Sequence, residues 1–228
     1  MQTTIRSVRS SRYSYTQHLQ HQSSKTSNPL KMSKKTVLMT GFGDFATVKG
    51  NLSWLGVDSM DQDHIERTYD IIFYKKKIEV SYKAVDSGIP KLLAELQPDL
   101  IINCGLHETS PGFRLETQAN KRYYKIHDNE GLCPPNNVHS TDGPDTIKTD
   151  MDVVKLCELF NATPKVAGLT AAVSNDAGLF VCEYIYYATL AHRRGAKALF
   201  VHVPGKGFTK EQIAIGLERI LEICLKMM

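Results

Sequence analysis

The sequence predicts an α/β fold: a three-layer α/β/α sandwich with a mainly parallel central sheet. Two observations lead to this class. Short runs that are apolar throughout, such as residues 36–40, 100–104 and 198–203, are typical of strands buried on both faces. Segments with helical spacing alternate with these runs, as in a parallel sheet covered by helices on both sides. The 228 residues suffice for one such domain with a core of its own.

The expected elements follow one another as strand, loop and helix. Strands are predicted at residues 36–40, 70–73, 77–83, 100–104, 169–174 and 198–203, and helices at 91–96, 150–159, 179–193 and 210–227. Helix 91–96 ends before Pro98, because the residue that precedes a proline is disfavoured in helical conformation. Helix 150–159 begins with acidic residues, which the positive helix end stabilises. In such sheets ligands and chemistry gather at the carboxyl ends of the strands.

The charge of the chain is unevenly distributed. Five of the 28 Lys and Arg lie in residues 1–31, which contain no acid, so residues 32–228 carry 23 basic against 24 acidic side chains. A nearly neutral body lacks the excess of Lys and Arg that phosphate backbones require, so we expect no nucleic-acid partner. Residues 1–31 are predicted to be a disordered basic extension and residues 32–228 a single domain.

The cellular address is inferred from two features. The longest apolar runs are too short to cross a bilayer, so we expect no membrane association. The five cysteines are an odd number without a dense framework, which favours a reducing, intracellular compartment. Residues 1–31 are either an upstream extension before a start at Met32 or a mitochondrial presequence. The first interpretation is favoured because an amphipathic apolar face is missing, so we expect a cytoplasmic protein.

Cys182 follows the strand at residues 169–174 and a sharp Asp-Ala-Gly turn. This order places Cys182 in or near the first turn of the next helix. There the helix dipole and free N–H groups would lower the pKa of the thiol and could hold a developing oxyanion. The alternative is a small buried apolar residue, which is the commonest fate of a free cysteine.

His202 lies near the end of the otherwise apolar strand 198–203, one crossover from Cys182. A titratable group in that position needs a partner, and a cysteine with a histidine base is a known nucleophilic pair. A core histidine bonded to a carbonyl is the alternative. The acid that would orient the imidazole is Glu116, Glu108 or Glu130, and spacing does not choose among them.

Two other functions are less well supported. Dinucleotide binding at Gly41-Phe42-Gly43 requires a third glycine three residues after Gly43, but Ala46 occupies that position. A zinc site would combine Cys104 and His107 with Cys133 and His139, but these pairs do not share a standard spacing. We therefore expect neither a metal nor an organic cofactor.

Several blocks in a fixed order then resemble the pyroglutamyl-peptidase I family of cysteine peptidases, its animal members more than its bacterial ones. The blocks are Gly41-Phe42-Gly43-Asp44-Phe45, Asp128-Asn129, the nine residues from Ser174 to Cys182, and Phe200-Val201-His202-Val203-Pro204. The resemblance runs from about Lys34 to the C-terminus. It implies a phosphorylase/hydrolase-like fold, a single peptidase domain over residues 32–228, and removal of N-terminal pyroglutamate (5-oxoproline) from peptides through a thioester.

The resemblance also assigns residues. Cys182 would be the nucleophile, His202 the general base and Glu116 the orienting acid, since Glu116 stands twelve residues before Asp128. The residues expected at the lactam ring are Phe42, Phe45, Asn51, Ile126, Phe180 and Val181. A small uncharged ring suits aromatic faces and a few hydrogen bonds.

Some positions depart from the bacterial pattern. Lys125 stands where those members have an arginine thought to help the oxyanion, and Leu106 replaces a glutamine that bonds the lactam. A catalytically weakened paralogue that binds pyroglutamyl peptides without efficient turnover is therefore the alternative function. The oligomeric state, monomer or homo-oligomer, stays open.

Overall fold

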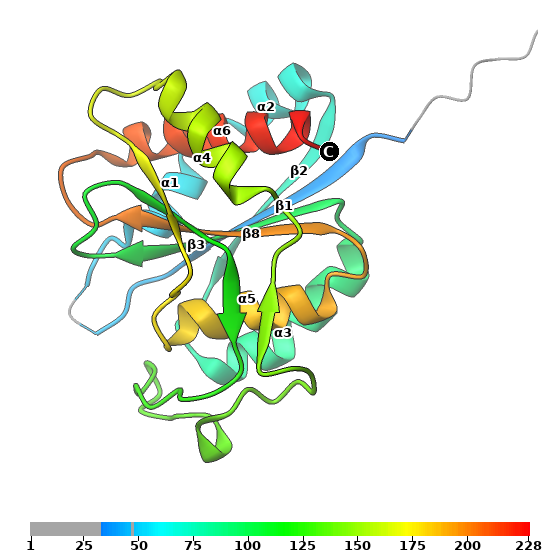
Figure 1. Ribbon diagram of the computed structural model, residues 1–228, viewed down its shortest axis with the longest axis vertical. Coiled ribbons are helices and arrows are strands. Elements are labelled where there is room, and N and C mark those ends of the chain that lie inside the picture. The colour runs from blue at the N-terminus through cyan, green and yellow to red at the C-terminus, as the bar shows by residue number, and fades with distance from the viewer. Residues whose placement is uncertain (1–32, 47) are drawn as a thin grey trace, which may run out of the picture. The chain divides into compact units, whose positions relative to one another are not determined.

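A six-stranded sheet has helices on both of its faces (Figure 1). The computed structural model describes residues 33–46 and 48–228, and residues 34–228 form one compact unit. The expectation for residues 1–31 lies outside the described residues. The predicted three-layer α/β/α class is confirmed.

The strands lie in the order β2-β1-β3-β8-β4-β7, and all neighbours are parallel except β4 and β8. The strands of this sheet are β1 (Lys35–Phe42), β2 (Ile71–Ile78), β3 (Leu100–His107), β4 (Phe113–Glu116), β7 (Ala171–Ser174) and β8 (Lys197–Pro204). The central strands β1, β3 and β8 are buried on both faces, as their unbroken apolar runs predict.

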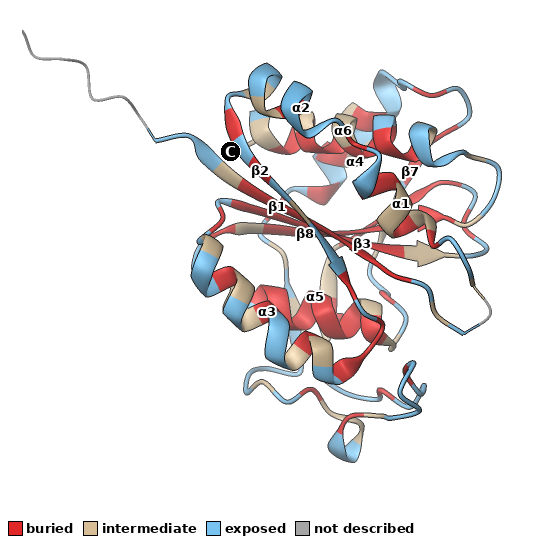
Figure 2. Ribbon diagram, turned by 180° about the vertical axis from the view of Figure 1, so that it is seen from behind, coloured by how far each residue is buried: buried red, intermediate tan, exposed pale blue. Residues whose placement is uncertain are grey.

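Alternate side chains of each strand enter different cores. On β1, Val37 and Met39 enter the core shared with α1 (Leu52–Asp58), α2 (Gln62–Tyr69), α4 (Val153–Ala162) and α6 (Lys210–Lys226). Leu38 and Phe42 enter the opposite core, shared with α3 (Tyr82–Leu96) and α5 (Val181–His192). Figure 2 shows the burial of α5 and of the central strands between the two layers. Because successive side chains of a strand point to opposite faces of the sheet, every second side chain of β3, β4 and β8 faces α5.

Two neighbouring elements, β2 and α3, differ from the predicted ones. Residues 71–78 form one strand, β2, where two strands were predicted at 70–73 and 77–83, and residues 79–81 lead from the sheet to α3. β2 is an edge strand with an exposed face, so its Tyr74 and Lys76 stay in solvent and its pattern is not continuously apolar. α3 starts at the N-cap Ser81, far before residue 91, because Gly88 and Pro90 lie inside the helix and disguise its pattern.

Other elements have no clear signal in the sequence. They are the short helices α1 and α2, the edge-side strand β4, and the two-stranded ribbon of β5 (Gln118–Asn120) and β6 (Thr146–Lys148). All are short, and β4 to β6 make at most four-residue pairings, which tertiary contacts select more than local preference does. In the part of the chain that the structure describes, the helices are too short or too polar to span a bilayer.

The long connection between β5 and β6 is held on α5 by His139. This side chain is 3% exposed, its Nε2 lies 3.1 Å from the Tyr184 carbonyl oxygen, and its ring stacks on Tyr184 with centroids 3.9 Å apart. Its Nδ1 accepts a 3.0 Å hydrogen bond from the N–H of Thr141. Both ring nitrogens are therefore used by the neutral imidazole, and burial lowers the pKa of His139 to about 4.

His139 should make the fold sensitive to acid. Its pKa is lower in the folded chain than in the unfolded one, so its contribution is present at neutral pH and is lost as pH falls from about 6.5 to about 4. The loss is about 3 kcal/mol. Urea unfolding at pH 7 and pH 4 should show this loss in the wild type and its absence in His139→Gln, although that variant is less stable at pH 7. The exposed His127→Gln is the control, and equal pH sensitivity of His139→Gln and wild type would contradict the assignment.

Candidate active site

A buried carboxylate and an imidazole meet at the centre of the site. Glu116, the last residue of β4, accepts a 2.8 Å hydrogen bond at Oε1 from Nδ1 of His202 on β8. Glu116 is 0% exposed and His202 3%. Phe200 on β8 packs in the core shared with α5, and Leu115 on β4 packs in the opposite core, so His202 and Glu116 both lie on the α5 face of the sheet. The bond fixes the proton on Nδ1 and leaves Nε2 free to accept one. The hydroxyl of Tyr186 on α5 donates to the Glu116 carbonyl oxygen at 3.0 Å, which ties β4 to this helix.

Gly105 makes room for the thiol beside the imidazole. It pairs with His202 in the parallel register of β3 and β8, and an added Cβ would lie 2.7 Å from Sγ of Cys182. Only a glycine lets the sulfur rest on the strand next to His202. Cys182 and His202 line the same pocket. The structure thus brings together Cys182, His202 and Glu116, which the sequence places far apart.

The turn before Cys182 is held by Glu183. This carboxylate is buried, and it accepts hydrogen bonds from the Leu179 N–H at 3.1 Å and from the backbone and side chain of Asn120 at 3.0 and 2.9 Å. Leu179 has a φ of 49°, so the turn has a conformation that non-glycine residues seldom adopt. Glu183 therefore stabilises the strained entry into α5.

α5 begins without a side-chain cap, which distinguishes it from α1, α2, α3, α4 and α6. Its N-cap is Phe180, and Cys182 is its second residue, which confirms the prediction that Cys182 lies in or near the first turn. The first N–H groups of a helix have no carbonyl partner within it, so those around Cys182 are available to an anion.

The expected low pKa of Cys182 is wrong. Burial raises the pKa of this thiol to about 12, and the nearby carboxylates of Glu116 and Glu183 act in the same direction. These effects outweigh the helix N-terminus, because the thiol lies over a buried strand next to two acids. The resting group is a neutral thiol.

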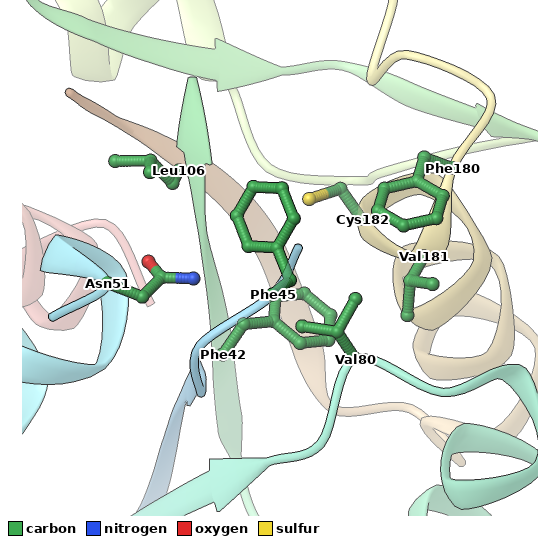
Figure 3. A pocket seen from close by; sticks show the side chains of 8 residues that line it. All are labelled: Phe42, Phe45, Asn51, Val80, Leu106, Phe180, Val181 and Cys182. Carbon is green, nitrogen blue, oxygen red and sulfur yellow. The ribbon is translucent and has the colours of Figure 1, made fainter. Parts of the chain in front are cut away.

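An aromatic pocket opens beside Cys182 (Figure 3). It contains about 290 Å³ that no protein atom occupies, part of it open to solvent. Its lining residues are Phe42, Phe45, Asn51, Val80, Leu106, Phe180, Val181 and Cys182. The rings of Phe45 and Phe180 lie 6.3 Å apart at 52°, on either side of the sulfur of Cys182 in this view. No lining side chain carries a charge, so the pocket suits a small uncharged ring.

Asn51 has a structural task in this pocket. Its Oδ1 caps α1 by accepting from the N–H and hydroxyl of Ser53, and its Nδ2 donates to the Gly43 carbonyl oxygen at 2.8 Å. It thereby holds the loop that carries Phe42 and Phe45. One N–H of the amide is left for a ligand.

Ile126 lies in the second pocket, which adjoins the aromatic one and shares Leu106, Phe180 and Cys182 with it. It is 52% exposed, and Lys125 beside it is exposed as well. Among the alternative acids, Glu108 is an exposed residue of this second pocket, and Glu130 accepts a hydrogen bond from Ser81 at 2.9 Å. Only Glu116 contacts the imidazole.

Sequence reasoning overlooked Val80 and Arg114. Val80 lines the aromatic pocket from the segment wrongly assigned to a strand. Arg114 precedes Glu116 by two residues, so in a strand it must share the face of Glu116. Recognising residues 113–116 as a strand would have found it.

A thiol beside an imidazole and a carboxylate, at the strand ends of an α/β sandwich, defines a cysteine-type hydrolase. The comparisons with known proteins agree. The family model described as pyroglutamyl peptidase matches residues 35–218. Rat pyroglutamyl-peptidase 1 is 31% identical over 195 residues, which cover 85% of this chain and 91% of the rat protein. A pyrrolidone-carboxylate peptidase of Pseudomonas fluorescens is 29% identical over 184 residues, covering 79% of this chain and 82% of the bacterial protein.

Solved structures share the fold. Pyrrolidone carboxyl peptidase from Thermococcus litoralis matches with a TM-score of 0.73 at 23% identity, covering 84% of this chain and 94% of that one. Pyroglutamyl peptidase I from Bacillus amyloliquefaciens has a TM-score of 0.73 at 24% identity, covering 85% and 98%. This chain belongs to the pyroglutamyl peptidase family, as its sequence motifs predict.

Gly105→Ala should disable the site while most of the fold persists. The new methyl group would lie 2.7 Å from both Sγ of Cys182 and Cζ of Phe200, so the thiol must move. We expect kcat to fall about 100-fold, since a displacement of about 1 Å has that effect, and stability to fall by about 1–3 kcal/mol. The control is Gly88→Ala in α3, where an added Cβ meets nothing within 4 Å. Full activity of folded Gly105→Ala would show that the thiol does not need this strand position.

Proposed function

We propose that this protein is a cysteine exopeptidase that hydrolyses N-terminal pyroglutamate from peptides, with Cys182 as nucleophile, His202 as general base and Glu116 as the group that orients His202. The observation that carries the proposal is the contact of His202 with buried Glu116 in a pocket that also contains Cys182, next to an uncharged aromatic pocket. The family membership of the chain supports the same substrate class.

The substrate end fits the aromatic pocket by its chemistry. Pyroglutamate has no charged amine, because its α-nitrogen is part of a lactam. Phe42, Phe45, Phe180 and Val181 offer apolar faces, and backbone groups with Asn51 offer hydrogen bonds. A free N-terminal ammonium would lose its hydration in this pocket without gaining a carboxylate partner, so ordinary N-termini are disfavoured.

The remainder of the peptide would occupy the second pocket, on the far side of Cys182. That pocket includes Ile126 and His202 and is partly exposed. Its openness to solvent suits a leaving chain of varied sequence.

Attack begins from a neutral thiol. His202 Nε2 accepts the proton of Cys182 as the sulfur adds to the carbonyl carbon between pyroglutamate and the next residue. Glu116 stabilises the resulting imidazolium through Nδ1, and the uncapped N–H groups of α5 stabilise the oxyanion. Simultaneous transfer avoids a free thiolate, which burial and the acids disfavour.

The second half of the reaction restores the thiol. The imidazolium gives its proton to the leaving amine as the carbon–nitrogen bond breaks, which leaves a pyroglutamyl thioester on Cys182. His202 then takes a proton from water, whose oxygen adds to the thioester carbon. The carbon–sulfur bond breaks and the proton on His202 returns to sulfur. The product leaves as pyroglutamic acid, which gives its carboxyl proton to solvent.

A cytoplasmic location is proposed together with this activity. All five cysteines, which lie in the described residues, are free thiols, and such thiols persist in reducing compartments.

Release of the fluorophore from a pyroglutamyl amide tests the activity. We expect hydrolysis by the wild type and a loss of at least about 10⁴-fold in Cys182→Ala, because the nucleophile carries the covalent step. Cys157→Ala removes a half-buried thiol in α4 and should retain activity within about threefold. If the wild type binds a pyroglutamyl peptide in calorimetry but releases no product, the protein is a binding paralogue and the enzymatic proposal is wrong.

The raised pKa of Cys182 gives a separate test on the free protein. Since the pKa is about 12, the thiolate fraction should grow about tenfold per pH unit between pH 7 and pH 10. The rate of Cys182 alkylation by iodoacetamide, followed by peptide mass spectrometry, should rise in proportion without a plateau. A plateau below pH 9 would mean that a stable thiolate forms in the resting site.

A further inference from the structure

Arg114 lies across the strand from the base of the proposed site. The antiparallel register of β4 and β8 pairs Arg114 with His202. Arg114 shares its face of β4 with Glu116, and its side chain, 30% exposed, lines the second pocket with Cys182 and His202. This arginine therefore lies against the reacting groups, although the mechanism above does not use it.

The guanidinium connects the acid of the site with the turn that carries the nucleophile. Its Nη2 donates to the Ser174 hydroxyl at 2.7 Å and to the Asp176 carbonyl oxygen at 3.1 Å. Its Nε lies 3.6 Å from Oε1 of Glu116. Ser174 ends β7, and Asp176 lies in the turn that leads to Cys182. One rigid side chain thus spans from Glu116 to this turn.

The charge of Arg114 matters because Glu116 is completely buried. Within residues 33–46 and 48–228, Oε2 of Glu116 has no hydrogen-bond partner, and Oε1 has only the bond to His202. An ionised carboxylate in such surroundings is costly unless a cation lies near it. His107, whose Nε2 lies 3.3 Å from Nη1 of Arg114, does not supply that charge, since burial lowers its pKa.

We propose that Arg114 is a positioning residue: its charge compensates the buried carboxyl group of Glu116, and its planar guanidinium fork holds the turn of Cys182 at a fixed distance from Glu116 and His202. The inference rests on the proposed function. The two Nη2 hydrogens of Arg114 are occupied by protein acceptors, so in this arrangement they are not oxyanion donors.

Two substitutions separate the charge from the fork. Arg114→Lys keeps a charge near Glu116 but loses the two-point contact with Ser174 and Asp176. Arg114→Met loses both. Arg122→Lys and Arg122→Met are matched controls, because Arg122 pairs with Asp145 on the exposed loop, outside the second pocket.

The pH profile of kcat/KM reports the charge. The groups around His202 that bear on its titration are Glu116 and Arg114 on β4, His107 on β3, Cys182 on α5, and Glu108 and Asp176 in the pocket wall. Without the arginine, the hydrogen-bonded Glu116–His202 pair binds a proton more readily, because the positive charge of Arg114 no longer opposes it. The acidic limb should therefore move up by about one pH unit in Arg114→Met and stay in place in Arg114→Lys.

The fork is reported by kcat. We expect kcat to fall about 10-fold in Arg114→Lys and about 100-fold in Arg114→Met, since both variants lose the contacts with the turn. KM should change by less than about threefold, because the aromatic pocket is untouched. A merely structural role would lower the melting temperature without moving the acidic limb. Wild-type kcat and an unmoved limb in Arg114→Met would overturn the proposal, as would equal effects in the Arg122 controls.

The alkylation rate of Cys182 tests the role of Arg114 without requiring hydrolysis of a substrate. Loss of the contacts with Ser174 and Asp176 should shift the Cys182 thiol, so the rate at which iodoacetamide alkylates it at pH 8 should change by more than about threefold in folded Arg114→Met. An unchanged rate would contradict the positioning role. If the wild type hydrolyses no pyroglutamyl amide, the proposed function fails, and this measurement still decides whether Arg114 positions the site.

Discussion

The buried hydrogen bond between Glu116 and His202 is the interaction on which the site depends. It forms because β4, which runs in the same direction as β7 and antiparallel to β8, pairs its residues 114–116 with residues 200–202 of β8. The same sheet register places Gly105 beside His202, and Gly105 gives Cys182 its resting place. A change of register of β4 or β8 by one residue would therefore disturb all three side chains at once, because such a slip turns every side chain of the strand to the opposite face of the sheet.

The charged side chains of the site lie apart from the uncharged pocket next to the thiol. The ionic groups Glu116 and Arg114 lie behind the imidazole, whereas the aromatic pocket in front of the thiol has no charged lining. This division fits a reaction whose substrate end is uncharged and whose charges develop only during attack. The high pKa of Cys182 belongs to the same arrangement, since a half-buried thiol near two carboxylates is stable as a neutral group until the base removes its proton.

The sequence predicted the parts of the fold whose patterns are continuous. The apolar runs of β1, β3 and β8 and the long helices α4 and α6 were found, although the ends differ by a few residues. α1, α2 and β4 were missed because they are short and take their stability from the packed core. β2 and α3 were misjudged because an edge strand lacks the buried pattern and because Gly88 and Pro90 lie inside the helix.

The sequence by itself determined the family, the candidate nucleophile and base, and the aromatic character of the pocket, because these depend on residue types in a fixed order. Residue spacing left Glu116, Glu108 and Glu130 open, and the family resemblance favoured Glu116. Only the tertiary structure shows the contact itself, in which Glu116, and neither Glu108 nor Glu130, meets His202. It also revealed the place of Arg114 and reversed the expected pKa shift of Cys182. The physical reason is that burial and charge proximity arise between residues distant in the chain, whereas sequence patterns describe mainly what neighbours along the chain do.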